Sequence, residues 1–500
     1  MSSTEVGRIG SQTVAIVGIS RRSKWVVAAR AVVCGLLVGV LVACYRQGIE
    51  LATRFAKWMY PQIRRDAWLA LPWGLAALVV GLFVAWLVRL EPMASGSGIP
   101  QVEGVVRLGL KMRWAMVLVV RFLGGLLCAM FGLSLGQEGP SVQIGAATAQ
   151  GMARGTRGLI LRSGKKFPAP SIEESRPDTS QTDVLITSGA AAGLSAAFSA
   201  PLSGVMFALE EVHHSFSPAI LLGAAGAALS ADAVAKAWFG LTPVLDFTRF
   251  SQLTLPQYWW IVPLGLLAGL VGTMMNRLLL GAQTVYAKLP WWSRPVVALA
   301  IALPIGLFLP QELGGGATLI KLAEQSAAAT GITFLALLFL GKMFFTAVSF
   351  GSGAPGGIFM PILTVGTLLG AMYGVLLHGL DVGFSGSGVG APSMSTEHVV
   401  FAWGSFLVRV NSVAGGGLVP ASIIPVFAVC AMAGTLTASV QAPLTSILLT
   451  VEMSGTLTHM LPVALCSFLA LMVSDLLGTT PIYDALLERC VRSGHQGVES

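Results

Sequence analysis

A single acidic side chain lies at the centre of a long uncharged stretch of this chain. From Phe122 to Ala153, Glu138 is the only Asp, Glu, Lys or Arg, with sixteen residues before it and fifteen after it. The stretch is long enough to cross a bilayer, and a charge at that depth costs at least ~2.5 kcal/mol. A carboxylate in such a place is a functional residue by default.

The residues around Glu138 predict the start of a helix inside the membrane. The motif reads Gly-Gln-Glu-Gly-Pro, with Gly136, Gly139 and Pro140 around the acid. Proline is tolerated in the first turn of a helix and interrupts a preceding one. The free main-chain N–H groups of the new helix would point into the bilayer interior, where they would attract an anion.

The composition is typical of a polytopic membrane protein. Of the 500 residues, 54% are hydrophobic and 11% are charged, with a mean hydropathy of +0.77. Ordinary soluble domains carry roughly 25% charged residues. The net charge of +8 includes no basic run with interleaved aromatics, so we expect no nucleic-acid partner. The six cysteines show no metal-ligand spacing, and we expect no metal and no cofactor.

The charge pattern suggests three parts. We expect a cytoplasmic N-terminal segment at 1–24, a transmembrane domain at 25–490 and a C-terminal tail at 491–500. A polar insert at about 154–182 has an excess of Lys and Arg, which assigns it to the cytoplasm. A weakly charged insert at about 381–421 would then lie outside the cell.

Several apolar stretches predict broken helices. Residues 343–380 and 410–451 contain no charged residue and are longer than one crossing, yet Gly or Pro interrupts both. Broken and re-entrant helices explain this pattern. Near the N-terminus we expect a first span at 26–45, then a basic loop, then a second span at 68–88.

Two segments of the chain recur at fixed offsets. Ser199 to Glu210 returns as Gln441 to Glu452, and Glu138 to Gly145 aligns with Phe359 to Gly366. Two halves with broken helices of the same design indicate a secondary transporter whose site lies between inverted repeats at mid-membrane.

At this point the sequence resembles the CLC family of chloride channels and chloride/proton antiporters. The family's GSGIP stands at 96–100, its G(K/R)EGP at 136–140 and its GxFxP at 357–361, and Tyr483 matches its closing tyrosine. The motif glycines and prolines are Gly96, Gly98, Pro100, Gly136, Gly139, Pro140, Gly357 and Pro361. The resemblance covers about residues 25–490. Within the family, the chain resembles prokaryotic members without CBS domains.

The resemblance implies an all-α polytopic fold of two inverted repeats, homodimeric, with one anion pathway in each subunit. It also implies a set of anion ligands, namely the hydroxyls of Ser97 and Tyr483 and the main-chain N–H groups of Ile358 and Phe359. Glu138 would be the gating glutamate, and Glu211 the inner proton relay.

Physical chemistry supports these roles separately. A dehydrated halide needs donors without a full countercharge, since a paired lysine would bind it too tightly to release it. The Glu138 carboxylate is itself an anion and can occupy the same donors. Burial and a neighbouring chloride favour its protonated form, which no longer competes.

We therefore expect a multi-pass protein of the bacterial inner (cell) membrane that exchanges chloride for protons and is not an enzyme. Its expected partners are chloride, protons, the lipid bilayer and a second copy of the chain.

Three alternatives remain open. A passive chloride channel on the same fold would need Glu138 but not Glu211, and a fluoride/proton antiporter is less favoured because Ser97 and Tyr483 fit the chloride-type pattern. Residues 132–136 spell G-x-S-x-G around Ser134, as in a serine hydrolase, but such an enzyme needs a histidine at the same depth. One departure from the family is Gln137, which stands where a basic residue is usual.

Overall fold

Helices make up nearly all of the described chain. The computed structural model describes residues 21–162, 181–245, 247, 250–386, 400–403, 406–409 and 419–496. The helices of the first half are α2 (Arg21–Arg65), α3 (Ala70–Leu90), α4 (Ile99–Leu108), α5 (Trp114–Met130), α6 (Glu138–Arg162), α7 (Gln181–Phe198), α8 (Pro201–Phe207) and α9 (Pro218–Phe239). Those of the second half are α10 (Ile261–Ala287), α11 (Ser293–Phe308), α12 (Ala317–Thr330), α13 (Ile332–Gly351), α14 (Phe359–Gly386), α15 (Ile424–Val440), α16 (Pro443–Ser454), α17 (Met460–Leu476) and α18 (Ile482–Gln496).

Eight of the described helical segments are long and apolar enough to cross a membrane. Their surroundings differ. The apolar window of the α15 segment is 100% buried inside the protein, whereas that of the α3 segment is only 33% buried. The exposed side of α3 consists of large apolar residues such as Leu71, Leu75 and Val79. An apolar outer surface around a wholly buried central helix is the arrangement expected of a multi-pass protein in lipid.

The segment 46–65, which the sequence analysis predicts to be a loop, is helical, so that prediction is wrong. Helix α2 continues from Arg21 to Arg65 without a break, and Pro61 lies inside its last turns. The basic residues at 46–65 therefore lie on a helix rather than in a loop. Arg46 and Arg54 both pair with Glu50, each at a spacing of four residues. Such pairs stabilise the helix through a stretch that hydropathy alone does not predict.

The inverted repeat is visible in the breaks between helices. Helix α7 ends and α8 begins across Ser199, which has a φ of +54°, and α15 passes to α16 across Gln441, which has a φ of +64°. These two residues occupy the same position in the recurring segments. Each break is followed by a proline in the first turn of the next helix, as the sequence predicts.

Glycines bring the helices of each repeat into close contact. A Cβ added to Gly145 of α6 would lie 2.0 Å from the oxygen of Gly189 in α7, and one added to Gly366 of α14 would lie 2.6 Å from the oxygen of Ala431 in α15. Only glycine permits these approaches. The pairs α6–α7 and α14–α15 are therefore the same small-residue packing used twice.

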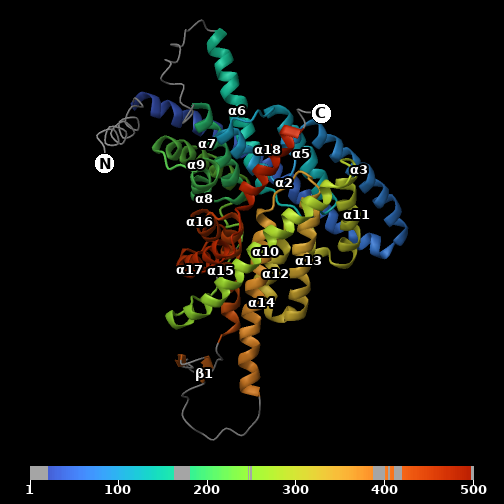
Figure 1. Cartoon of the computed structure of the whole chain (residues 1–500), viewed down its shortest axis with the longest axis vertical. Coiled ribbons are helices and arrows are strands. Elements are labelled where there is room, and N and C mark those ends of the chain that lie inside the picture. Colours follow the sequence, from blue (N-terminus) through green and yellow to red (C-terminus); the bar gives the residue numbers. More distant parts are fainter. Residues whose placement is uncertain are drawn as a thin grey trace.

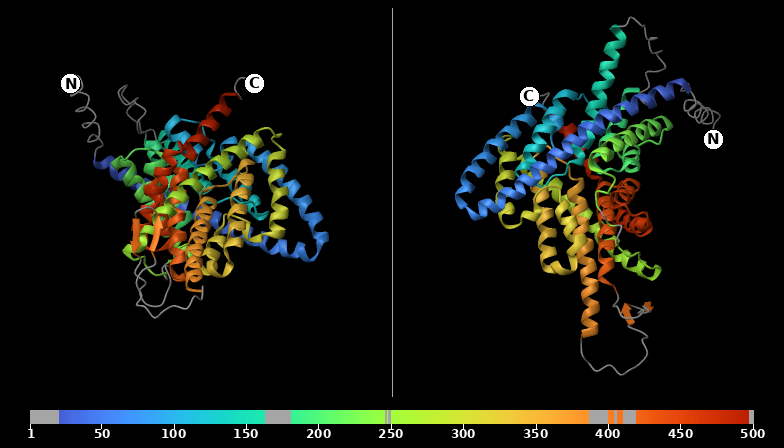
Figure 2. Two further views of the ribbon diagram at one scale, coloured as in Figure 1. Left: turned by 60° about the horizontal axis from the view of Figure 1, so that its bottom comes forward. Right: turned by 180° about the vertical axis from the view of Figure 1, so that it is seen from behind.

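The two long helices leave the molecule at opposite ends. The C-terminal part of α6 extends from the same end as the start of α2 and the end of α18, whereas α14 extends the other way (Figures 1 and 2). Strands β1 (Val400–Trp403) and β2 (Phe406–Arg409) form an antiparallel hairpin near the end of α14. Residues 1–20, 163–180, 387–399 and 497–500, on which parts of the predicted segments fall, lie outside the described residues.

The two half-helices α8 and α16 cap each other. Glu210 accepts hydrogen bonds from the main-chain N–H and the hydroxyl of Thr445, both at 2.8 Å. Glu452 accepts a bond from the main-chain N–H of Ser203 at 2.8 Å and a second from its hydroxyl. Each acid therefore satisfies the N-terminus of the other repeat's half-helix, where the helix dipole favours negative charge.

The reciprocal caps predict matched losses of stability. We expect Glu452→Gln and Glu210→Gln each to destabilise the protein by about 1–2 kcal/mol, because each removes a charged acceptor from a helix N-terminus. Thermal unfolding in detergent measures this. Glu488→Gln is the control, since Glu488 makes only an exposed pair with Arg492. Equal melting midpoints for Glu452→Gln and this control would contradict the capping role.

Candidate anion-binding site

Several helix N-termini meet where the sequence motifs converge. Helices α4, α6 and α14 begin at the three glycine motifs, with Pro100, Pro140 and Pro361 in their first turns. α18 begins directly after Pro481. Since the first N–H groups of a helix have no partner within it, each start presents donors and partial positive charge.

The main chain ties these helix starts together. Gly136 and Gly357 exchange two main-chain hydrogen bonds, both 2.7 Å long. The N–H of Gly356 donates to the oxygen of Gly96 at 3.1 Å, and the N–H of Gly96 donates to Gly353. Loops from both repeats therefore form one backbone framework, and the motif glycines lie inside it.

Glu138 lies within this framework. Its residue is 1% exposed. Its Oε2 atom has no hydrogen-bond partner among the described residues. The carboxylate lies where the starts of α6 and α14 meet, because a Cβ added to Gly136 would lie 2.1 Å from its Oε2 atom and 3.2 Å from the Cβ of Met360. Main-chain N–H groups of Glu138 itself, Met360 and Gln137 act electrostatically on it.

Ser97 and Tyr483 lie together and are both buried. The Tyr483 hydroxyl interacts with that of Ser97, but neither oxygen has a partner with full hydrogen-bonding geometry in the described chain. A buried hydroxyl is normally paired. Two unpaired hydroxyls side by side can therefore both donate to a third group.

The start of α14 adds main-chain donors beside Tyr483. The oxygen of Ile358 accepts the first helical bond, from the N–H of Ile362, so the N–H groups of the first turn are left without a helical partner. The ring of Phe359 stacks on that of Tyr483, with centroids 6.4 Å apart and an interplanar angle of 12°. The four residues predicted as anion ligands, Ser97, Ile358, Phe359 and Tyr483, are therefore brought to one region.

Glu211 is separate from this donor cluster. It lies in a π-helical turn, Ala208–Val212, that follows α8, and it is 5% exposed. Its charge acts on the Tyr483 hydroxyl. Its neighbour Glu210 is held by its hydrogen bonds to α16, which agrees with a structural interpretation of Glu210.

Arg121 organises the loop that carries Ser97. It is completely buried, and its guanidinium donates to the oxygen of Gly96 and to Gln143 and lies 3.4 Å from the oxygen of Ser95. The sequence analysis does not single out Arg121. An arginine directly before a long uncharged stretch is the signal that could have indicated this role.

Gln137 stands where the family motif usually has a basic residue. Arg46 of α2 acts electrostatically on the Glu138 carboxylate. It is 9% exposed, and its guanidinium lies 4.1 Å from the centroid of the Phe239 ring. The sequence does not suggest this electrostatic effect because Arg46 is 92 positions away from Glu138.

The G-x-S-x-G motif at 132–136 contributes to packing through Ser134. The Ser134 hydroxyl lies 2.7 Å from that of Thr346, and the Ser134 N–H donates to Ser349. Of the described histidines, His213 contacts Thr187 and His378 contacts the oxygen of Val419. Ser134 is thus engaged in packing between α5 and α13 rather than in a nucleophile–base pair.

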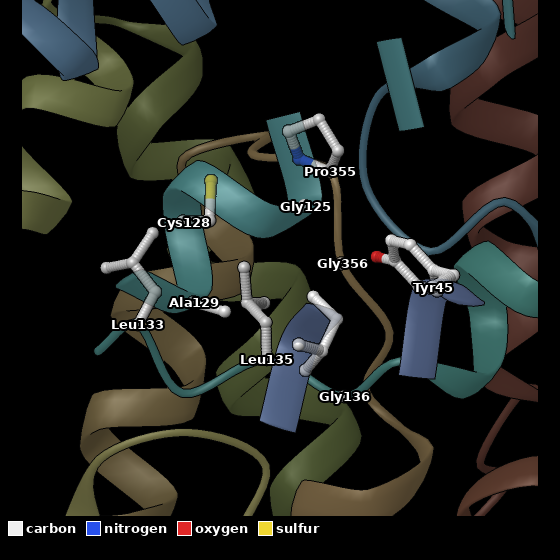
Figure 3. Close-up of a pocket in the computed structure, with 10 residues that line it drawn as sticks. Tyr45, Gly125, Cys128, Ala129, Leu133, Leu135, Gly136, Pro355 and Gly356 are labelled. Atoms are coloured by element: carbon white, nitrogen blue, oxygen red, sulfur yellow. The ribbon is translucent and has the colours of Figure 1, made fainter. Parts of the chain in front are cut away.

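A small cavity lies beside the backbone just before Glu138. Figure 3 shows its lining, with the Tyr45 hydroxyl directed toward Gly356 and with Leu133, Leu135 and Gly136 on the other sides. The wall combines apolar side chains with main-chain groups of glycines and the Tyr45 hydroxyl. Free space therefore adjoins the segment that leads into the gate motif.

Comparisons with known proteins agree with these features. Residues 79–475 match the family described as "Voltage gated chloride channel". The chain is 31% identical to the H(+)/Cl(-) exchange transporter ClcA of Vibrio parahaemolyticus, covering 91% of this chain and 89% of that protein. It is 31% identical to ClcA of Vibrio cholerae, with 92% and 88% covered. The structure of a slow cyanobacterial Cl⁻/H⁺ antiporter superposes with a TM-score of 0.77 at 26% identity, covering 93% and 98%.

The close approach of Gly139 to Ser97 predicts a steric effect on anion binding. A Cβ added to Gly139 would lie 2.4 Å from the main-chain oxygen of Ser97 and 2.7 Å from its hydroxyl. We expect Gly139→Ala to weaken chloride binding, measured by calorimetry in detergent, by about tenfold, because overpacking of about 1–3 kcal/mol must displace Ser97.

A glycine on the same helix provides the matched control. A Cβ added to Gly155 of α6 would meet nothing within 4 Å, so Gly155→Ala should bind chloride as the wild type does. Equal affinities for Gly139→Ala and Gly155→Ala would show that Ser97 is not held against the start of α6.

Proposed function

The chain belongs to the voltage-gated chloride channel family, and we propose that it is a chloride/proton antiporter gated by Glu138. The observation that carries this proposal is the position of the Glu138 carboxylate between the starts of α6 and α14, next to Gly136 and Met360, where main-chain N–H groups of both helices act on its charge. Chloride needs the same donors. The ClcA relatives are named as exchangers of H⁺ and Cl⁻, which supports antiport over passive conduction.

In the proposed mechanism, chloride binds at the hydroxyls of Ser97 and Tyr483 and at the N–H groups of Ile358 and Phe359. Neither hydroxyl has a partner with full hydrogen-bonding geometry among the described residues, so each can donate to the halide. Partial charges suffice because a site that must release its ion quickly cannot hold it with a full countercharge.

Glu138 links the anion to the proton. The ionised carboxylate competes with chloride for the donors. Once protonated, it is neutral, no longer competes, and can move toward the free space beside Gly136 (Figure 3). Glu211, buried in its π-helical turn, would pass protons from the cytoplasmic side without touching the anion.

The assembly and location follow from the same family. We propose a homodimer in the bacterial inner membrane, with chloride and protons as cargo and no cofactor. Leu202 of α8 and Leu444 of α16 occupy equivalent positions in the two repeats, and both are exposed. Apolar exposure on the paired half-helices is consistent with contact to a second subunit or to lipid.

The alternatives are now less favoured. A fluoride exchanger on the same fold would not need the paired hydroxyls of Ser97 and Tyr483, and a passive channel would not need a buried Glu211. Serine hydrolase chemistry does not fit a protein of this family, and the Ser134 hydroxyl already contacts Thr346.

The proposed role of Glu138 predicts that its replacement uncouples chloride transport from proton transport. We expect Glu138→Ala in proteoliposomes to pass chloride while chloride-driven proton uptake falls at least about tenfold, because the protonatable competitor has been removed. A chloride electrode and a pH electrode on the same sample measure both fluxes. Proton-driven chloride exchange at the wild-type rate in this variant would refute the proposed gate.

The inner relay predicts a different phenotype. Glu211→Gln should lose proton movement but retain a chloride flux that still depends on external pH, because Glu138 can still be protonated from outside. The same two electrodes measure this. A wild-type protein that moves chloride but no protons would instead identify a passive channel.

A further inference from the structure

Three ionisable side chains meet beside the segments that carry the proposed transport residues. Ligand atoms of Glu103, His214 and Asp484 all lie within 4.8 Å of one another. They come from three elements: α4, the loop after the π-helical turn, and α18. His214 is three residues after Glu211, and Asp484 directly follows Tyr483.

The three side chains, Glu103, His214 and Asp484 (the cluster), extend from the solvent-exposed surface into the protein. The side chains of His214 and Asp484 are 38% and 45% exposed, whereas that of Glu103 is 1% exposed. The Nε2 atom of His214 lies 3.5 Å from the Oε1 atom of Glu103. The other carboxylate oxygen of Glu103, Oε2, is buried and has no hydrogen-bond partner among the described residues. A buried carboxylate oxygen left unpaired can accept a proton.

The cluster also acts on Glu211. Among charged neighbours, Glu103 and Asp484 exert the largest electrostatic effects on the Glu211 carboxylate. Glu211 has its own buried position in the turn after α8. Helix α4, which carries Glu103, packs against the π-helical turn that carries Glu211, so the buried end of the cluster adjoins that turn and its exposed end faces solvent.

Other charged groups around the cluster are few. Arg107 of α4 pairs with Glu103 and lies 3.6 Å from the Oδ1 atom of Asp484. On the turn after α8, Glu210 is engaged in capping α16, and His213 contacts Thr187. The guanidinium of Arg107 pairs with Glu103 and lies near Asp484, whereas Glu103, Asp484 and Glu211 are three acids that act on one another, and such a group of acids attracts protons.

Asp484 titrates closer to neutrality than a free aspartic acid does. Burial and the Glu103 carboxylate raise its pKa above the ordinary value, and His214 and Arg107 only partly oppose this. The imidazole of His214 is a second acid–base group beside Asp484.

We propose that Glu103, His214 and Asp484 form a proton-loading cluster that takes protons from the cytoplasm and delivers them to Glu211. This inference rests on the proposed function, in which Glu211 is the inner relay. His214 or Asp484 takes a proton from water, the proton passes to the Glu103 carboxylate, whose Oε1 atom faces His214, and then from Glu103 to the Glu211 carboxylate. The donor returns to its deprotonated form, so only a proton is moved.

The same three residues are also ligand types for a divalent cation. The guanidinium of Arg107 already occupies the space between Glu103 and Asp484, and a metal ion would have to displace it. Proton transfer needs no such displacement, and the geometry therefore favours protons.

The test measures chloride and proton fluxes together in proteoliposomes at several internal pH values. The variants are Glu103→Gln, His214→Gln and Asp484→Asn. We expect each variant to lower chloride-driven proton uptake by about tenfold at an internal pH of about 7.5, because a positioned acid–base group has been lost. Chloride flux should persist, and the deficit should narrow at acidic internal pH, where protons are abundant.

A control variant lies on the same helix as Asp484. Glu488→Gln removes an acid whose side chain is 70% exposed and pairs only with Arg492, so its proton-to-chloride ratio should match that of the wild type. His214→Gln lies in a loop and is the variant least able to disturb folding, which makes its pH profile the decisive measurement.

The outcomes separate this inference from the proposed function. If the cluster variants keep the wild-type coupling ratio at every pH while Glu211→Gln loses it, the loading role is wrong and the antiporter proposal stands. If chloride and proton fluxes fall together in all three, the cluster is only structural and the inference is overturned. If Glu211→Gln itself stays coupled, the inner relay is wrong, and the inference fails with it.

Discussion

The structure depends on main-chain N–H groups that are left without helical partners inside the membrane. In a bilayer interior, every such group must find an acceptor within the protein or in what the protein binds. Here the starts of α6 and α14 direct these donors at one carboxylate, that of Glu138. The glycine contacts between α6 and α7, and between α14 and α15, hold the broken helices in place. An anion site of this kind exists only while both repeats remain packed.

Two completely buried cations, Arg121 and Lys342, bind main-chain oxygens of loops. Arg121 donates to the oxygens of the loop before Ser97, and the Nζ atom of Lys342 donates to the oxygens of Glu312 and Gly314 at 2.9 and 2.7 Å. Carbonyl oxygens that would repel an anion are thereby engaged elsewhere. The long-range attraction of two positive charges is retained, while the contacts left to the ion come from neutral donors, which allow release.

The sequence predicts where helices are interrupted, but not the contacts between distant segments. Proline and glycine after uncharged stretches correctly predict the starts of α6, α8, α14 and α16, because these residues act through local sterics. The extension of α2 to Arg65 is missed since its charged residues lower the hydropathy while i,i+4 pairs maintain the helix. Neither Arg46 nor Glu103 stands out in the sequence, because their effects on Glu138 and Glu211 depend on contacts between distant segments.

Coupling a proton to an anion at a site made of neutral donors requires a group that is an anion in one state and neutral in the other. A carboxylate meets this condition, but it must reach the donors, which confines it to the first turn of a helix, as Glu138 is. A second acid that supplies protons must not compete for the same donors. Two adjacent acids, Glu210 and Glu211, stand in the turn after α8, and the hydrogen bonds of Glu210 to the start of α16 engage one of them. The cap that joins the two repeats therefore also fixes the turn that carries Glu211, so the position of the proposed proton relay and the packing of the repeats are set by one interaction.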